Sequence, residues 1–176
     1  MGKWEEALLS FQKSSALSLR TGEVRQQGMG LNGQGEIYRR QGKLEQAIEA
    51  YEEARQIWQT FNFEEFVGIA LINLGASYLK KGILSEARAH LEKSRQIFQG
   101  LEAHMHLPEI LRYLAEVELL SGQAVKAQRF AQEAVDWALK LERRLEEGSA
   151  RRALGQVGLG HGSGYQVQTS GLDDAY

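Results

Sequence analysis

The fold of this 176-residue chain is decided by two stretches that share one pattern. Residues 33–59 read GQGEIYRRQGKLEQAIEAYEEARQIWQ, and residues 73–99 read NLGASYLKKGILSEARAHLEKSRQIFQ. The two stretches match at an offset of 40, most clearly where RQIWQ at residues 55–59 returns as RQIFQ at residues 95–99. Self-similarity at a fixed period of this length indicates a solenoid, in which each repeat packs only against its neighbours.

Glycine and alanine mark the same positions in successive periods. Three columns align at the offset of 40: Gly35, Gly75, Ala115 and Gly155; Gly42, Gly82, Gly122 and Gly162; and Ala7, Ala47, Ala87 and Ala127. Gly42, Gly82 and Gly122 suit the left-handed backbone conformation that ends a helix. The Gly35 column faces the Ala47 column, which predicts that two helix backbones approach each other closely. Each period is therefore expected to hold two helices.

Apolar residues recur three and four positions apart up to about Val157, and no useful length of sequence alternates apolar with polar residues. This spacing predicts an all-α chain of one-sided helices that pack against each other. We expect about eight helices, over residues 3–20, 23–41, 43–60, 63–81, 83–100, 105–121, 123–142 and 144–157. Residues 140–147 contain no helix breaker, which leaves open a continuous helix there and hence a domain swap.

Composition excludes several classes of protein. The chain has 21 Lys and Arg against 23 Asp and Glu, a net charge of -2, and no Cys. The near-neutral charge argues against nucleic acid as the main partner, and the lack of Cys excludes disulfides, thiol nucleophiles and Cys-ligated zinc. No run approaches the roughly 18 apolar residues that span a bilayer. Glu5 and Glu6 stand where a signal peptide would be apolar, so we expect a cytoplasmic protein.

The spacing of four residues in each repeat resembles the tetratricopeptide repeat signature: Gly35, Tyr38, Gly42 and Ala47, then Gly75, Tyr78, Gly82 and Ala87. The period of 40 is longer than the usual value of about 34. It is similar to the variant found in kinesin light chains, spindle-orientation scaffolds and the sensory regions of bacterial signalling proteins. The resemblance implies a right-handed superhelical array of antiparallel helix pairs that binds other proteins and catalyses no reaction.

The resemblance covers residues 1–157, which divide into a half repeat, three repeats and a partial repeat at residues 1–27, 28–67, 68–107, 108–147 and 148–157. Residues 158–176 lose the apolar pattern and are expected to form a flexible glycine-rich tail. The half repeat matches second helices and lacks its own first helix. This predicts either a missing upstream segment or a surface for homo-oligomerisation at Trp4, Leu8 and Phe11.

The third repeat departs from the signature. Glu118 stands where the earlier repeats have Tyr38 and Tyr78, and Ala131 replaces a bulky apolar residue. These changes predict looser packing in this repeat. Pro108 predicts that a helix begins near it or kinks just before it, because proline lacks the N–H that the first turn leaves unused.

Two other patterns are compared with known sites. Gly28, Gly30 and Gly33 spell Gly-x-Gly-x-x-Gly, but no strand precedes them as a dinucleotide site would require. They predict a soft helix, and the sequence offers no packing role for these three glycines. His104 and His106 are two residues apart, so on a helix they point to different sides and predict no metal site. No cofactor and no catalytic residue is predicted.

The first helices of successive repeats are expected to line a concave groove. Residues displaced from the core stripe of these helices are the candidate partner-binding set: Asn32, Glu36, Arg39, Ile69, Ile72, Asn73, Lys80, Glu109, Arg112, Tyr113, Glu116 and Arg152. The set is mixed in charge, with an expected apolar patch at Ile69, Ile72 and Tyr113. The resemblance places Asn73 where relatives bind the backbone of a peptide.

The expected function is a non-enzymatic protein–protein interaction module that binds a peptide or helical segment of a partner in this groove. Arg39, Lys80 and Arg112 are expected to pair with carboxylates of that segment. The alternative is a sensory or oligomerisation section of a larger bacterial signalling or regulatory protein. No membrane contact is expected.

Overall fold

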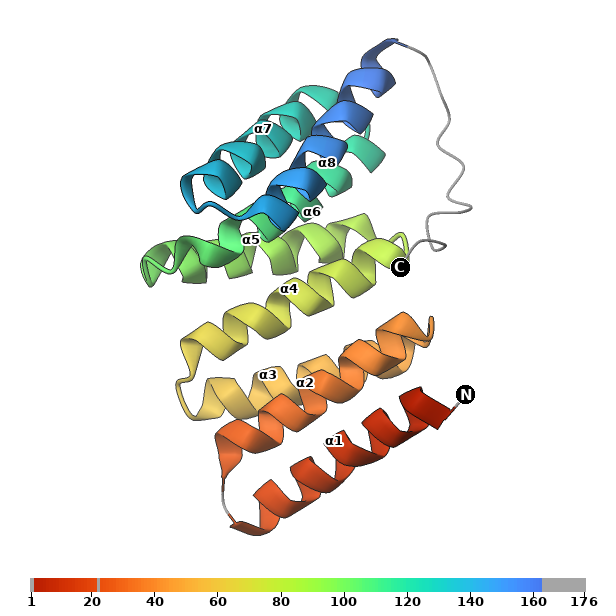
Figure 1. Cartoon of the computed structure of the whole chain (residues 1–176), viewed down its shortest axis with the longest axis vertical. Helices are drawn as coiled ribbons and strands as arrows, with labels where there is room; N and C mark the ends of the chain where they lie inside the picture. Colours follow the sequence, from red (N-terminus) through yellow and green to blue (C-terminus); the bar gives the residue numbers. More distant parts are fainter. Residues whose placement is uncertain (1, 22, 163–176) are drawn as a thin grey trace.

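The computed structural model describes residues 2–21 and 23–162, and within them the chain forms helices and no strand. The elements are α1 (Gly2–Thr21), α2 (Val24–Arg40), α3 (Leu44–Thr60), α4 (Glu64–Lys80), α5 (Leu84–Gly100), η1 (His104–His106), α6 (Leu107–Leu120), α7 (Ala124–Lys140) and α8 (Arg144–Gly162). Successive helices stack antiparallel into a superhelical array (Figure 1). The predicted all-α array of about eight helices is confirmed. In the described part, no helix is long and apolar enough to cross a membrane.

Turns of one geometry recur every 20 residues. Six described residues have a positive φ: Gly42 (74°), Asn62 (56°), Gly82 (77°), Glu102 (54°), Gly122 (73°) and Glu142 (54°). The prediction that Gly42, Gly82 and Gly122 end helices in the left-handed conformation is confirmed. The other three turns have asparagine or glutamate in this conformation, and no sequence pattern predicted a left-handed residue there.

The last two helices are separate. α7 ends at Lys140 and α8 begins at Arg144, and between them Glu142 adopts a left-handed φ of 54°. The Arg143 N–H donates to the Ala138 carbonyl at 2.9 Å, which closes the turn in the same way as at the glycine positions. The hypothesis of one continuous helix over residues 140–147 is therefore wrong. The repeat imposes this turn although a non-glycine residue there costs roughly 1–2 kcal/mol.

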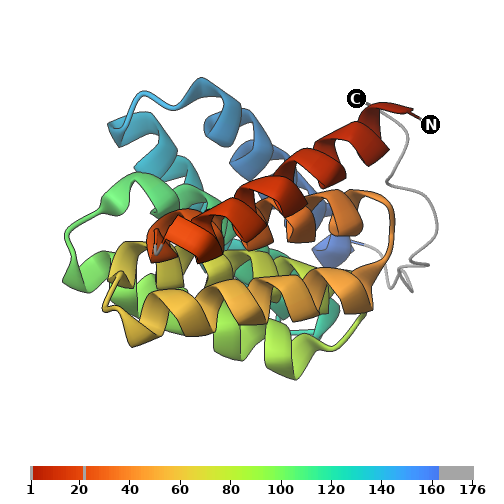
Figure 2. The same ribbon diagram turned by 90° about the horizontal axis from the view of Figure 1, so that it is seen from below.

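The helices form two sets with different neighbours. The first helices of the repeats, α2, α4, α6 and α8, contact one another along one side of the array. The second helices, α3, α5 and α7, contact mainly the first helices on either side of them. The array therefore curves with the first helices on its concave side. Viewed from below, α1 covers one end of the stack, where it packs against α2 (Figure 2).

Glycines on the first helices hold large side chains of the second helices. A Cβ atom added at Gly35 would lie 2.6 Å from the Tyr51 ring, and one at Gly75 would lie 2.6 Å from the Leu91 side chain. The predicted close packing at these glycines is confirmed. At Gly35 the nearest atoms all belong to Tyr51, whereas at Gly75 the backbone carbonyl of Ala87 also lies 3.3 Å from the added Cβ atom, as the facing columns predicted.

Two glycines of α2 without an assigned role also face aromatic rings. A Cβ atom at Gly28 would collide with the Trp58 indole, and one at Gly33 would lie 2.5 Å from the Phe11 ring. Both belong to the Gly-x-Gly-x-x-Gly pattern, so packing explains most of that pattern. Gly155 differs, because a Cβ atom there would meet nothing within 4 Å. Its predicted close-packing role is wrong, since no second helix follows α8 in the described part of the chain.

The boundaries of the array differ from expectation at one end. α8 continues as a helix through Gly162, five residues beyond the predicted end of the array at residue 157. The start of the flexible tail was therefore predicted too early, because residues 158–162 belong to α8. Residues 163–176 of the expected tail lie outside the described part of the chain. Pro108 lies in the first turn of α6, as predicted.

Alanine substitutions at two glycines of one column test the packing rule. Gly75→Ala should lower the free energy of unfolding by about 1–3 kcal/mol, because the added methyl group overlaps Leu91 and the core must shift. Gly155→Ala, at the equivalent position of α8, should raise it by up to about 1 kcal/mol, because alanine favours a helix. Urea unfolding followed by circular dichroism measures both. Equal effects of the two substitutions would contradict the rule.

Candidate functional site

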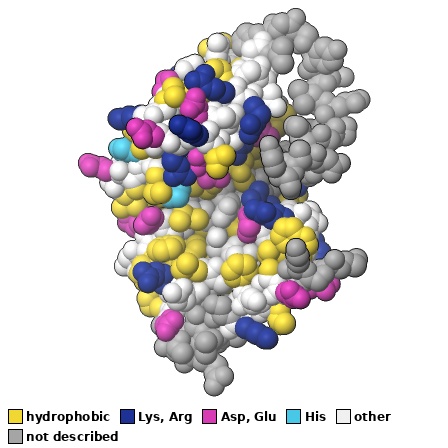
Figure 3. Space-filling model, viewed as in Figure 1, with side chains coloured by type: hydrophobic (Ala, Val, Ile, Leu, Met, Phe, Trp, Pro, Cys, Tyr) yellow, Lys and Arg dark blue, Asp and Glu magenta, His cyan; other side chains and the backbone are white. Residues whose placement is uncertain are grey.

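The candidate groove is the concave surface lined by the first helices. The twelve predicted residues all lie on these helices: Asn32, Glu36 and Arg39 on α2, Ile69, Ile72, Asn73 and Lys80 on α4, Glu109, Arg112, Tyr113 and Glu116 on α6, and Arg152 on α8. On the face shown in Figure 3, basic, acidic and apolar side chains are interspersed. The groove therefore combines charge of both signs with apolar surface.

Glu36 binds three groups of its own chain. Arg39 Nη2 donates to Glu36 Oε2 at 2.7 Å, Arg40 Nε donates to Oε1 at 2.7 Å, and the Tyr51 hydroxyl donates to Oε2 at 3.2 Å. Burial alone would raise the pKa of Glu36, but the hydrogen bonds from Arg40 and Arg39 outweigh it and hold the pKa below its ordinary value. Arg39 is thus already paired, and the expectation that it meets a partner's carboxylate requires competition with Glu36.

Asn73 joins two first helices. Its Nδ2 donates to Asn32 Oδ1 at 3.0 Å, so the amides of α4 and α2 are paired across the groove. Each amide can form more than one hydrogen bond, and no other side-chain bond of Asn73 is found in the described part of the chain. Asn73 is half-buried. Its remaining donor and its oxygen are therefore held in a defined orientation by the bond to Asn32.

Arg112 has a longer contact with a carboxylate of its own chain than Arg39 has. Its guanidinium carbon lies 3.9 Å from the centre of the Tyr113 ring, and its Nη1 is 3.7 Å from Glu116 Oε2. The second distance is too long for a strong hydrogen bond. Arg112 also lines a cleft of about 340 Å³ between α6 and α8, together with Ser149 and Arg152. Stacking on Tyr113 fixes the guanidinium while most of its donors stay available.

Glu109 is a half-buried carboxylate beside these cations. It lines a cleft of about 230 Å³ between α6 and α8 that also contains Arg112 and Leu145. Burial raises the pKa of Glu109, and the charges of Arg112 and Arg39 offset only part of this effect. No ion pair to Glu109 is found within the described residues. Its negative charge is therefore unfavourable in the folded protein.

The expected apolar patch is smaller than predicted. Ile72 is only 4% exposed and belongs to the core, so its assignment to the groove surface is wrong. Ile69 and Tyr113 are half-buried and pack against the same core. The reason is that α4 lies between α2 and α6, so more of its circumference is covered than in a helix with one neighbour. Lys80 is exposed at the end of α4.

The histidines considered as metal ligands pack against aromatic rings. The His106 ring centre lies 4.3 Å from that of Phe98, and the His104 ring centre lies 4.7 Å from that of Trp137. Within the described residues no group of three His, Asp or Glu side chains could hold a metal ion. These two histidines fill the space where α5 passes into α6.

Sequence reasoning missed one polar site outside the groove. Arg88 Nε donates to Glu118 Oε1 at 2.6 Å, which joins α5 to α6 beside a cleft of about 530 Å³. The signal was present, because Glu118 departs from the tyrosine of the earlier repeats. It was interpreted only as a packing defect.

Comparison with known proteins identifies the repeat. A family model described as Tetratricopeptide repeat matches residues 1–60, 26–100 and 66–140. None of the curated proteins matches the chain. Among solved structures, the nearly identical tetratricopeptide-like repeats attributed to a kinesin light chain of Podosopora anserina superpose with a TM-score of 0.70 at 19% identity, over 92% of this chain and 80% of that one.

Two further structures show the same similarity. A variant of the Podosopora anserina repeats gives a TM-score of 0.71 at 19% identity, over 92% of this chain and 80% of that one. BtubC (BKLC) from P. vanneervenii gives 0.70 at 15% identity, over 92% of this chain and 85% of that one. At such low identity these structures show a shared fold.

Removal of the Glu109 charge should stabilise the protein in a pH-dependent way. Because the folded-state pKa of Glu109 is raised, its contribution to stability is greatest below the unfolded value and is lost as pH rises through the folded value. Glu109→Gln should therefore melt at a higher temperature than the wild type at pH 7. The difference should shrink toward pH 4, near the pKa of an unfolded glutamate at about 4.3.

Thermal unfolding at a series of pH values measures this effect. Glu53→Gln, at an exposed position of α3, is the matched control and should change the melting temperature little at any pH. A lower melting temperature for Glu109→Gln at pH 7, or a difference that does not vary with pH, would contradict the argument.

Proposed function

Because this chain belongs to the tetratricopeptide repeat family, we propose that it holds a peptide or helical segment of a partner protein in its concave groove. Repeats of this family generally mediate protein–protein interaction, and the fold is typical of a non-enzymatic scaffold. The observation that carries the proposal is the grouping of Asn73, Arg112 and Tyr113 on neighbouring first helices, where each has hydrogen-bonding or stacking capacity left.

The hydrogen-bonding and apolar groups of these residues indicate which side chains the bound partner segment carries. Asn73, oriented by its 3.0 Å bond to Asn32, offers a donor and an acceptor, which is what a peptide backbone requires. Arg112 offers guanidinium donors to a carboxylate, because its own contact with Glu116 is 3.7 Å long. Tyr113 supplies a half-buried ring for an apolar side chain. The segment therefore carries an acidic residue next to an apolar one.

The other cations of the groove have secondary roles. Arg39 is bound to Glu36 at 2.7 Å, so a partner's carboxylate must replace or share that contact. Arg152 is exposed on α8, and its Nη2 donates to Ser149 Oγ at 3.0 Å. Exposed charges of this kind add less to affinity than to the rate of association. The main contribution to affinity is therefore assigned to Arg112 and Asn73.

The double variant Asn73→Ala/Arg112→Ala tests the groove. Binding of a partner isolated by affinity capture and identified by mass spectrometry should weaken at least about tenfold, because loss of a charged contact and a backbone bond each costs more than about 1 kcal/mol. The matched control is Lys93→Ala/Gln96→Ala, which removes a cation and an amide from exposed positions of α5. Its affinity should be unchanged.

Helicity of both double variants is checked by circular dichroism. If the groove variant binds as tightly as the wild type while it stays folded, the proposed groove is not the binding site. If the α5 variant loses binding to the same extent, the partner binds the second helices instead.

Self-association through α1 is a second candidate function. α1 packs against α2, and Trp4 and Phe11 remain 43% and 37% exposed although Phe11 also covers Gly33. Leu8 is half-buried. A helix with an exposed apolar side of this kind is suited to association with another copy or with a larger assembly.

Light scattering on the chain over a range of concentrations tests this second candidate. The mean mass should rise with concentration in the wild type and should stay at the monomer value in Trp4→Lys, because a charge at that surface opposes its burial. Val125→Lys, at a residue 77% exposed on α7, is the control and should associate like the wild type. A wild type that stays monomeric at high concentration would exclude association through α1.

A further inference from the structure

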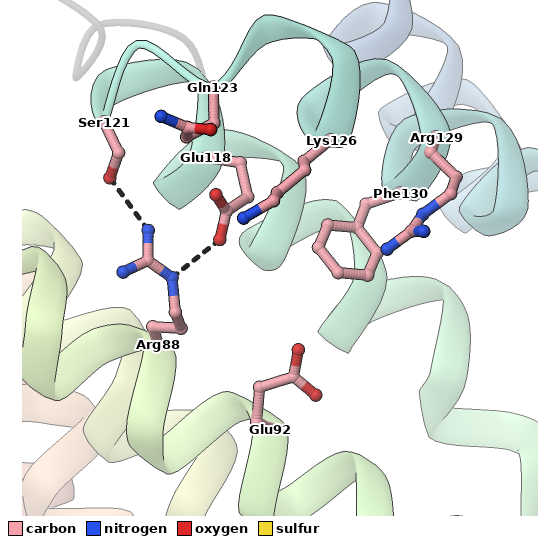
Figure 4. A pocket seen from close by; sticks show the side chains of 8 residues that line it. All are labelled: Arg88, Glu92, Glu118, Ser121, Gln123, Lys126, Arg129 and Phe130. Atoms are coloured by element: carbon pink, nitrogen blue, oxygen red, sulfur yellow. Dashed lines mark hydrogen bonds and ion pairs between the residues drawn. The ribbon is translucent and has the colours of Figure 1, made fainter.

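A cleft of about 530 Å³ lies between α5, the end of α6 and the start of α7 (Figure 4). Two of these helices, α5 and α7, are second helices of their repeats, and α6 is a first helix. Its lining includes Arg88, Glu92, Glu118, Lys126, Arg129 and Phe130. We call it the edge cleft. It shares no lining residue with the groove.

The edge cleft is a local departure from the repeat. One period earlier the equivalent positions hold mostly apolar or aromatic residues: Ile48, Glu52, Tyr78, Glu86, Ala89 and His90. There the Tyr78 ring stacks on His90 with centres 5.3 Å apart and planes 9° apart. At the edge cleft Glu118 stands in place of the tyrosine, and Arg88 and Arg129 stand in place of Ile48 and Ala89. Where a repeat breaks its own packing rule, a functional requirement is a common reason.

Glu118 has an unsatisfied oxygen. Arg88 Nε donates to Glu118 Oε1 at 2.6 Å, and Arg88 Nη2 donates to Ser121 Oγ at 3.0 Å. Glu118 is only 4% exposed, and its Oε2 is buried without a hydrogen-bond partner in the described part of the chain. A buried carboxylate oxygen without a donor is costly, so a donor supplied by a ligand would relieve this cost.

The charges around the cleft are unbalanced. Both carboxylates are taken, Glu118 by Arg88 and Glu92 by Arg95 at 3.1 Å. Lys126 and Arg129, by contrast, have no carboxylate within 4.0 Å among the described residues. They are both exposed and stand one helical turn apart on α7, at the border of the cleft (Figure 4). A ligand that fits must therefore be anionic and must also carry a hydrogen-bond donor.

We propose that the edge cleft is a second binding site, which takes an acidic peptide segment of a partner protein. A side-chain carboxylate of the segment binds Lys126 and Arg129, and a backbone N–H of the segment donates to Glu118 Oε2. An inorganic anion lacks the donor that Glu118 requires. A lysine or arginine side chain would have the donor but would meet two uncompensated positive charges. The site is independent of the groove and of the function proposed for it.

Fluorescence anisotropy with a defined probe tests the site on the full chain. The probe is a fluorescein-labelled peptide of alternating aspartate and glutamate, flanked by glycines and amidated at its C-terminus. The double charge reversal Lys126→Glu/Arg129→Glu should weaken its binding at least about tenfold, because both cations are lost and two repulsions are added. Arg25→Glu/Lys43→Glu makes the same change in net charge at exposed positions away from the cleft and should change affinity less than about twofold.

The role of Glu118 is tested by a cycle of two changes. Glu118→Gln keeps an oxygen for Arg88 but replaces Oε2 by an NH2 group, and N-methylation of the peptide removes its backbone donors. Each change alone should weaken binding, and the two together should weaken it no more than one alone, because both remove the same hydrogen bond. Independent, additive effects would show that Glu118 does not bind the peptide backbone. Thermal melting establishes the temperature at which every variant is fully folded.

Three further outcomes would overturn the proposal. The first is equal binding of a lysine peptide, and the second is equal loss of affinity in both charge-reversal variants. The third is loss of peptide binding in Asn73→Ala/Arg112→Ala, which would place the acidic peptide in the groove. Retention of binding in that variant, with loss in Lys126→Glu/Arg129→Glu, supports the edge cleft whether or not the groove has a partner.

Discussion

The whole array depends on one packing contact, in which a large side chain of a second helix lies in the space that a glycine leaves on the first helix. Gly35 receives Tyr51 in this way, and Gly28 receives Trp58. A glycine inside a helix costs about 1 kcal/mol relative to alanine. Burial of a large apolar side chain stabilises by roughly 1.5–3 kcal/mol, and Tyr51 and Trp58 are 0% and 1% exposed. The gain in burial exceeds the loss in helix propensity, so the glycine-rich α2 is stable only as part of the array.

Close packing of the first helices also determines which polar groups can act on a partner. Half-buried side chains satisfy each other first, because an unpaired polar group away from water is costly. Asn73 is therefore oriented by Asn32, and Glu36 is surrounded by donors from its own chain. Only the donors and acceptors that the chain leaves without a close partner can bind a ligand, such as the guanidinium of Arg112 in the groove. At the edge cleft such a group has a different origin, because Glu118 replaces a tyrosine and one of its oxygens is left without a donor among the described residues.

Much of the fold could be predicted, and less of the candidate site. The helices, their order and the glycine turns follow from spacings within one repeat, and the structure has them where they were expected apart from the later end of α8. The candidate residues lie on the predicted helices, yet Ile72 is in the core because α4 has first helices on both sides. The pairing of Arg39 with Glu36 was also not foreseen, although the two are one helical turn apart. Periodicity identifies the face of a helix, but it does not reveal how much of that face a second neighbour covers.

By itself, the sequence determined the period, the two-helix unit, the glycine turns and the resemblance to tetratricopeptide repeats. These are properties of residues at fixed separations along the chain, where local geometry leaves few choices. Only the tertiary structure decided which ring fills each glycine, that Glu142 adopts a left-handed turn, and that Gly155 faces open space. It also decided that Arg112 meets the Glu116 carboxylate only at 3.7 Å and that Lys126 and Arg129 meet no carboxylate within 4.0 Å among the described residues. Each of these depends on the distance between residues of different helices, which the packing of the complete array sets.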